Sequence, residues 1–73
     1  MAIQLSQIIK KWVPENSKVI DFGCGNGTLL NELITDKNVL GYGVEINDLK
    51  IAECIKKGVP VIKQDIDLSL IHI

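Results

Sequence analysis

This sequence of 73 residues has no large excess of charge of either sign, few cysteines and no long apolar runs. Eight basic and nine acidic residues give a formal net charge of −1, which provides no broad attraction to nucleic acid or to an anionic membrane. No apolar run approaches the length that spans a bilayer, and the polar amino terminus does not match a secretory signal. We therefore expect a cytoplasmic protein that binds neither nucleic acid nor a membrane.

The two cysteines, Cys24 and Cys54, are too few for a disulfide framework, and neither belongs to a Cys/His cluster with the spacing of a zinc site. Aromatic residues are also rare at 4%, whereas 47% of the residues are apolar. This composition is typical of a globular domain with an aliphatic core. A chain of this length forms one domain at most, and its stability is marginal because folding buries only about 60% of the surface of the unfolded chain.

The amino-terminal segment has the periodicity of an amphipathic helix, with one apolar face formed by Leu5, Ile8, Ile9 and Trp12. Pro14 ends this helix because its ring disfavours a helical conformation at Val13 and has no N–H to donate. An apolar stripe with this spacing most often packs into the core, and we expect the same here. The alternative is a partner-binding surface with Trp12 as its anchor.

Strands and helices are expected to alternate through the rest of the chain. The pattern predicts three strands and two further helices: strands from Lys18 or Val19 to Phe22, over 39–44 and over 60–65, and helices around 29–34 and over 48–57. The expected capping residues are Asn26 or Thr28, Asn47, and Gly58. Ile51 and Ile55 are expected to face inward. This alternation predicts an α/β fold, a Rossmann-like parallel three-stranded sheet of order 3-2-1 with flanking helices.

The stretch from Val19 to Thr28 is an apolar strand followed by three glycines at alternate positions, Gly23, Gly25 and Gly27. Glycine adopts positive φ at little cost and lets a ligand approach the backbone, while free N–H groups at a helix start can bind its polar groups. The stretch therefore predicts a nucleotide-cofactor loop. The match to the dinucleotide fingerprint G-x-G-x-x-G is imperfect, because the third glycine comes one residue early.

Glu45 closes the second predicted strand, 22 positions after Gly23. In nucleotide-binding βαβ units an acid about 20 residues after the glycines binds the ribose. A carboxylate suits this role because it offers two acceptor oxygens to two hydroxyl donors. The alternative for Glu45 is a solvated charge at the end of a strand, but its position relative to the glycines favours the ribose site.

The spacing G-x-G-x-G, with Asp21 two residues before the first glycine, resembles the motif of S-adenosylmethionine-dependent methyltransferases with a Rossmann-like fold. Together with the segments 41–46 and 64–67, it makes the chain resemble the amino-terminal fragment of a methionine biosynthesis protein of the MetW type. The resemblance covers nearly all 73 residues. It implies the first half of a class I methyltransferase fold, with S-adenosylmethionine as the cofactor.

The resemblance also implies roles for single residues. Asp21 would organise the loop and reach the cofactor's ammonium group through water, or else only cap the turn. Ile46 would lie against the adenine, or else occupy an ordinary core position. Asp65 would accept a hydrogen bond from the adenine amino group, and the Ile66 N–H would meet a ring nitrogen. The expected cofactor-binding residues are Asp21, Gly23, Gly25, Gly27, Glu45, Ile46, Asp65 and Ile66.

No residue is identified as a catalytic base or a metal ligand. Cys24 is expected to be a spacer within the loop, because no His/Asp constellation accompanies it. Asp67 is expected to be a solvated loop acid, and His72 has no visible partner.

Three functions are compatible with these patterns. The first is the cofactor-binding half of a methyltransferase-like protein linked to methionine biosynthesis. The second, also implied by the resemblance, is a non-enzymatic partner of a homoserine O-acyltransferase on the same scaffold. The third is an NAD-binding dehydrogenase fragment.

Doubly wound folds have a fourth strand beside the first. None follows in this sequence, so we expect residues 1–73 to form a single, incomplete domain whose first strand has an exposed edge. An edge of this kind recruits other chains, which predicts poor solubility. We expect the 73-residue chain alone to be inactive.

Overall fold

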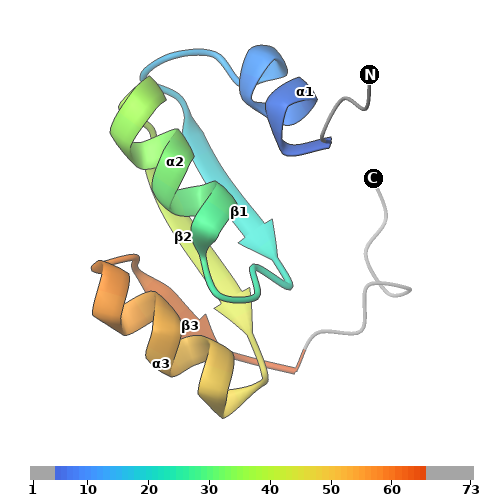
Figure 1. The fold of residues 1–73 in the computed structure, drawn as a ribbon, viewed down its shortest axis with the longest axis vertical. Coiled ribbons are helices and arrows are strands. Elements are labelled where there is room, and N and C mark those ends of the chain that lie inside the picture. The colour runs from blue at the N-terminus through green and yellow to red at the C-terminus, as the bar shows by residue number, and fades with distance from the viewer. Residues whose placement is uncertain (1–4, 66–73) are drawn as a thin grey trace.

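Three helices and three parallel strands alternate in residues 5–65, the part of the chain that our computed structural model describes (Figure 1). The elements are α1 (Leu5–Trp12), β1 (Lys18–Phe22), α2 (Thr28–Lys37), β2 (Leu40–Glu45), α3 (Asp48–Lys57) and β3 (Val61–Lys63). The strands lie in the order β1-β2-β3, which confirms the predicted Rossmann-like sheet of order 3-2-1. Within the described residues β1 pairs only with β2, so its other edge is unpaired, as expected.

The strand register brings the expected site residues to one edge of the sheet. Phe22 at the end of β1 aligns with Val44, and Val44 aligns with Ile62 of β3. Because the strands are parallel, the segments that follow them leave the sheet on the same side. The glycine loop, the end of β2 and the residues after β3 therefore meet at the carboxyl edge.

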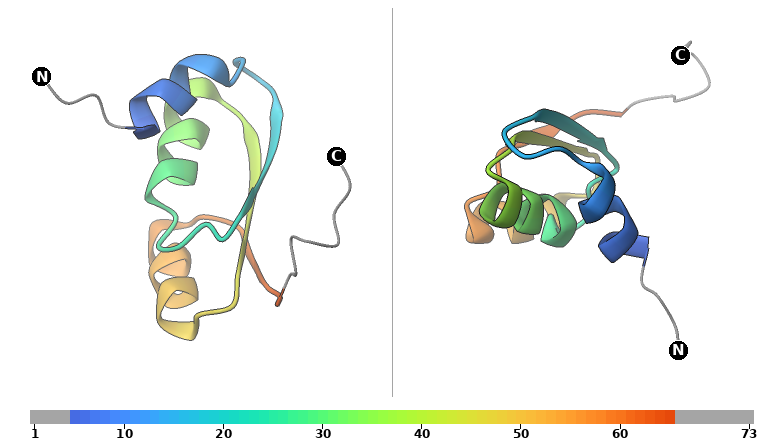
Figure 2. Two further views of the ribbon diagram at one scale, coloured as in Figure 1. Left: turned by 90° about the vertical axis from the view of Figure 1, so that its right-hand side faces the viewer. Right: turned by 90° about the horizontal axis from the view of Figure 1, so that it is seen from above.

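All three helices lie on one side of the sheet (Figure 2). The core between α2, α3 and the strands includes Leu30 of α2, Cys54 of α3 and Val59.

Two glycines of β2 allow α2 and the loop to approach the sheet closely. A Cβ at Gly41 would lie 2.6 Å from Cδ1 of Leu30, and a Cβ at Gly43 would overlap the Cys24 sulfur. Neither position therefore tolerates a side chain without a shift of its neighbours.

The other face of the sheet is apolar and uncovered by the described residues. Its exposed side chains are Ile20, Phe22, Leu40, Tyr42 and Ile62. Parallel sheets usually have both faces covered. This face is therefore a large apolar surface on so small a domain.

Two expectations about burial are wrong. In α1 no residue is buried, and Leu5 and Trp12 are 69% and 79% exposed, so these two side chains are not core. The helix is instead held to α2 in part by an ion pair between Lys10 and Asp36 at 2.8 Å. In α3 Ile55 is 66% exposed, because Cys54 occupies the inward position next to it.

The helix ends agree more closely with the sequence. Asn47 accepts the N–H of Lys50 at the start of α3, and Gly58 ends that helix with φ 75°. Gly27 occupies the N-cap position of α2, while the neighbouring Asn26 side chain accepts the N–H of Thr28 at 3.1 Å. The third strand is shorter than expected, Val61–Lys63. No helix in the described part of the chain is long and apolar enough to cross a membrane.

Candidate functional site

A cavity of about 150 Å³ lies at the carboxyl edge of the sheet. Four of the predicted site residues line it: Gly23, Glu45, Ile46 and Asp65. The cavity is also lined by Phe22, Val44 and Gln64, which sequence reasoning missed although each is next to a predicted residue. Pockets for drug-sized ligands measure about 300–1,000 Å³, so the described residues enclose only part of a site for such a ligand.

The Glu45 carboxylate points toward the glycine loop. Its Oε1 accepts the N–H of Gly25 at 2.8 Å, and its Oε2 accepts the N–H groups of Ile46 and Asn47, both at 3.0 Å. The hydrogen bonds from the Asn47 and Gly25 N–H groups lower the pKa of Glu45, so the side chain is ionised at neutral pH. Glu45 is thus a charged acceptor in direct contact with the loop.

These contacts limit what else Glu45 can bind. Each carboxylate oxygen has about two lone-pair sites, so Oε2 is fully engaged and Oε1 can accept about one more hydrogen bond. A second ribose hydroxyl would have to displace a backbone N–H.

The three glycines of the loop face different surroundings. Gly23 and Gly25 have φ of 70° and 60°, and a Cβ on either would meet no atom within 4 Å, so their backbone is open to an approaching ligand. Gly27, with φ 80°, is buried, and a Cβ there would lie 2.9 Å from the Cys54 sulfur. Gly27 therefore allows the loop to pack against α3 and does not line the cavity.

Four N–H groups of the glycine loop have partners within the protein. Gly23 and Cys24 donate to the carbonyl of Val44 at 2.7 and 3.2 Å, Gly27 donates to Cys24 at 3.1 Å, and Gly25 donates to Glu45. The turn folds back on the end of β2, which satisfies these donors within the protein.

Asp21 is half-buried and does not line the cavity. Burial raises the pKa of its carboxyl group. Its charge and that of Glu45 both act on the Cys24 thiol, whose pKa is raised to about 12, mainly by burial and then by the neighbouring Cys54. Cys24 is therefore protonated at neutral pH, whereas a nucleophilic cysteine reacts as the thiolate. This agrees with a role as a spacer.

Sequence reasoning also missed two side chains of α3 that contact the loop. The Cys54 thiol donates to the carbonyl of Gly25 at 3.2 Å, and Lys57 Nζ donates to the carbonyl of Asn26 at 2.8 Å. No local pattern in the sequence signals these contacts, because they join residues that are about 30 positions apart.

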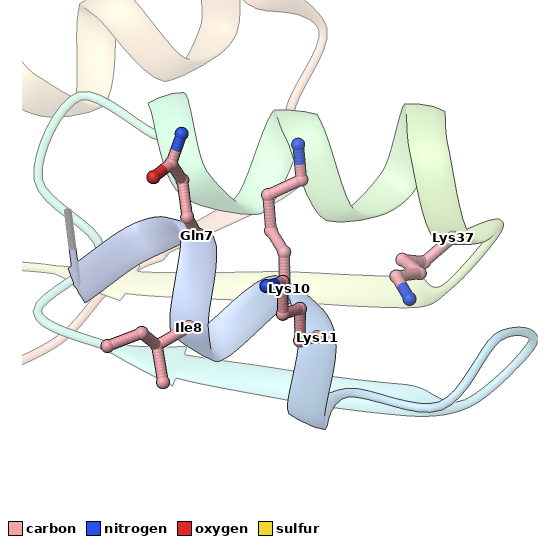
Figure 3. Close-up of a pocket in the computed structure, with 5 residues that line it drawn as sticks. All are labelled: Gln7, Ile8, Lys10, Lys11 and Lys37. Carbon is pink, nitrogen blue, oxygen red and sulfur yellow. The ribbon is translucent and has the colours of Figure 1, made fainter. Parts of the chain in front are cut away.

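A second, larger hollow of about 470 Å³ lies beside α1 and contains none of the predicted site residues. Its lining residues are Gln7, Ile8, Lys10, Lys11 and Lys37, and Figure 3 shows Gln7 and Lys10 reaching from α1 toward α2. Lys10 is already paired with Asp36. We therefore assign the candidate site to the smaller cavity, where the acids and the open glycine backbone meet.

Some expected residues cannot be compared, because Ile66, Asp67 and His72 lie outside the described residues. Within residues 5–65, no group of three or more His, Cys, Asp or Glu side chains could hold a metal ion.

The fold resembles that of a solved methyltransferase. A TehB-like S-adenosylmethionine-dependent methyltransferase from Corynebacterium glutamicum superposes with a TM-score of 0.68 at 20% sequence identity. The match covers 93% of this chain and 36% of that one, so the chain spans about a third of the length of the solved protein. At this identity the likeness establishes the methyltransferase fold.

No curated protein sequence matches the chain. The family described as methionine biosynthesis protein MetW, in contrast, matches residues 4–73, nearly the whole sequence. Together with the methyltransferase-like sheet and the predicted G-x-G-x-G loop, this match shows that the chain belongs to the MetW family of methionine biosynthesis proteins.

Proposed function

We propose that this chain binds S-adenosylmethionine at the carboxyl edge of its sheet. The observation that carries the proposal is the convergence of the Glu45 carboxylate and the open backbone of Gly23 at one cavity, with the N–H of Gly25 bound to the same carboxylate. The solved protein with the same fold is named as S-adenosylmethionine-dependent, which supports this choice of cofactor.

The contacts suggest how the adenosine part would be held. Glu45 accepts one ribose hydroxyl at the open position of Oε1. Ile46, which is 52% exposed and lines the cavity, packs against the adenine ring, and Asp65, which follows β3, accepts a hydrogen bond from the adenine amino group. The resemblance also implies that the N–H of Ile66, which lies outside the described residues, would meet a ring nitrogen.

The methionine part would lie along the glycine loop. Gly23 and Gly25 leave the space that it needs, while Gly27 supports the loop from beneath. Asp21 reaches the ammonium group through water. Bound S-adenosylmethionine would supply a methyl group on a sulfonium, and we assign no base to this chain.

The glycine spacing of the loop favours S-adenosylmethionine over NAD. The dinucleotide fingerprint is G-x-G-x-x-G, and here the third glycine, Gly27, comes one residue early. The N–H groups of Gly23, Cys24, Gly25 and Gly27 also have partners within the protein, so they are not available to a pyrophosphate.

Calorimetry with S-adenosylhomocysteine and with NAD tests the proposal. We expect S-adenosylhomocysteine to bind and NAD not to bind. Glu45→Gln should weaken binding about tenfold or more, since a hydrogen bond to a charged acceptor is lost. Glu53→Gln is the matched control, because Glu53 is an exposed acid of α3 outside the cavity. Binding of NAD without S-adenosylhomocysteine would refute the choice of cofactor.

A supporting role for a homoserine O-acyltransferase is the second candidate. The observation that favours it is the uncovered apolar face of the sheet, together with the exposed Trp12. We infer that such a partner, if it binds, uses these surfaces. Methyl-transfer assays in the presence of the acyltransferase separate the candidates: no transfer to any substrate, with cofactor binding intact, supports the partner role.

A further inference from the structure

Helix α3 holds the glycine loop through two consecutive carbonyl groups. The Cys54 thiol donates to the Gly25 carbonyl at 3.2 Å, and Lys57 Nζ donates to the Asn26 carbonyl at 2.8 Å. Residues three apart lie on the same side of a helix, so both donors project from one face of α3. The same lysine also lies 3.4 Å from the hydroxyl of Thr28, the first residue of α2.

We propose that Cys54 and Lys57 are positioning residues that fix the glycine loop in the shape required for cofactor binding. The proposal rests on the function proposed above, but its first consequence, a loop ordered before any ligand arrives, is independent of the ligand. Neither side chain lines the cavity, so both act through the loop backbone.

Gly25 is held on both sides. Its N–H donates to Glu45 Oε1 at 2.8 Å, and its carbonyl accepts from Cys54. Gly25 has φ 60°, which is only one of several backbone conformations that an unrestrained glycine adopts. With both backbone groups engaged, the open side of Gly25 remains directed away from protein atoms.

The helix is a rigid support at the position of these contacts. Cys54 is fully buried, in a core cluster with Leu30 and Val59. Its own carbonyl accepts the N–H groups of Gly58 and Val59, which close the end of α3. The loop is therefore attached to the buried core of the domain.

The second thiol supports the first. Cys24 Sγ lies 3.8 Å from Cys54 Sγ and 3.7 Å from the Gly25 carbonyl oxygen, and its raised pKa, about 12, keeps it protonated and able to donate to either acceptor. Cys54 can then donate its own proton to the Gly25 carbonyl. The pair thus forms a short chain of weak hydrogen bonds beneath the loop.

Hydrogen exchange of the ligand-free 73-residue protein, measured for single amides by NMR, tests the proposal. Lys57→Met keeps the length of the side chain and removes its donor, and Lys56→Met is the matched control on the exposed side of α3. We expect the amides of Gly25 and Gly27 to exchange about fivefold to tenfold faster in Lys57→Met, the size of effect that loss of one hydrogen bond gives. The core amides of Leu30 and Leu33 should be unchanged.

Two further variants separate positioning from packing at the cysteine. Cys54→Ala removes the donor, and Cys54→Ser restores one with a smaller atom. We expect faster loop exchange in the alanine variant and partial rescue in the serine variant. Affinity for S-adenosylhomocysteine should fall about as much as loop exchange rises.

The outcomes are distinct. Equal loop exchange in Lys57→Met and Lys56→Met refutes the positioning role, and so does an equal acceleration of loop and core amides, which reports global destabilisation. If the unmodified protein binds no S-adenosylhomocysteine, the proposed function fails, and the exchange rates of the ligand-free variants still decide whether α3 orders the loop.

Discussion

Alanine substitutions at Gly25 and Gly27 should separate backbone strain from packing in the loop. Both glycines have positive φ, 60° and 80°, and an L-residue in that conformation costs about 1–2 kcal/mol. At Gly25 the added Cβ meets no atom within 4 Å, so Gly25→Ala should destabilise the protein by this amount alone. The two substitutions therefore share the cost of backbone strain and differ in the cost of packing.

At Gly27 the added Cβ would lie 2.9 Å from the Cys54 sulfur and 3.5 Å from Val59. Forcing an extra carbon into a packed core costs about 1–3 kcal/mol more. Gly27→Ala should therefore destabilise by about 2–5 kcal/mol in total. Domains of this size are stable by only about 4–11 kcal/mol, so this loss is a large fraction of the whole.

Urea unfolding of the two variants and of the unmodified protein measures the difference. A double-mutant cycle with Cys54→Ala then identifies the contact, because removal of the sulfur leaves room for the new methyl group. We expect Gly27→Ala to cost clearly less when Cys54 is already alanine, and Gly25→Ala to show little such coupling. Equal destabilisation by the two glycine substitutions, or no coupling of Gly27 to Cys54, would refute the packing argument.

Three titratable groups of the site give further predictions. Because the pKa of Cys24 is raised from 9.0 to about 12, its thiolate fraction at neutral pH is lowered about 10³-fold. Iodoacetamide should therefore modify Cys24 much more slowly than a free thiol, as measured by mass spectrometry. A rate equal to that of a free thiol would contradict this prediction. Folding lowers the pKa of Glu45, so the stabilisation that its ionised carboxylate provides is present above the unfolded value of 4.5 and is lost as the pH falls through the folded value. The unfolding midpoint of Glu45→Gln should therefore lack this dependence on acid pH. Burial raises the pKa of Asp21 in the folded state, so the contribution of its protonated form to stability is fully present below the unfolded value of 3.8 and is lost as the pH rises through the folded value. At pH 7 the buried charge therefore destabilises the fold, and Asp21→Asn should increase the unfolding midpoint. A decrease would show that the charge has a favourable partner.

The sequence predicts the order of the elements and the position of the site, because both depend on local patterns. The alternation of strands and helices determines a parallel sheet, and a parallel sheet brings the ends of β1 and β2 together. Glu45 and Gly23 therefore line one cavity, and their role in binding a cofactor stays a prediction. The caps Asn47 and Gly58 were predictable for the same reason, since a cap depends on its own residue and the adjoining turn.

Features that depend on tertiary packing were not predictable. A helical stripe that includes Trp12 indicates an apolar face but not whether anything covers it, and in the described structure α1 buries no residue. The contacts of Cys54 and Lys57 with the loop depend on where α3 crosses the sheet. The internal bonding of the loop N–H groups likewise depends on how closely the turn returns to Val44.

The uncovered sheet face and the cofactor cavity share a residue, which connects the two candidate functions. Phe22 lines the cavity and is also 44% exposed on the apolar face of the sheet. A molecule that covers the carboxyl end of this face contacts Phe22 and so changes one wall of a cavity that is too small to enclose an adenosyl ligand by itself. Coupling between two binding events is reciprocal, so a partner that favours cofactor binding must itself be bound more tightly when the cofactor is present. Cofactor binding and support of a partner enzyme are therefore not competing descriptions of this chain, because the geometry at Phe22 allows each to depend on the other.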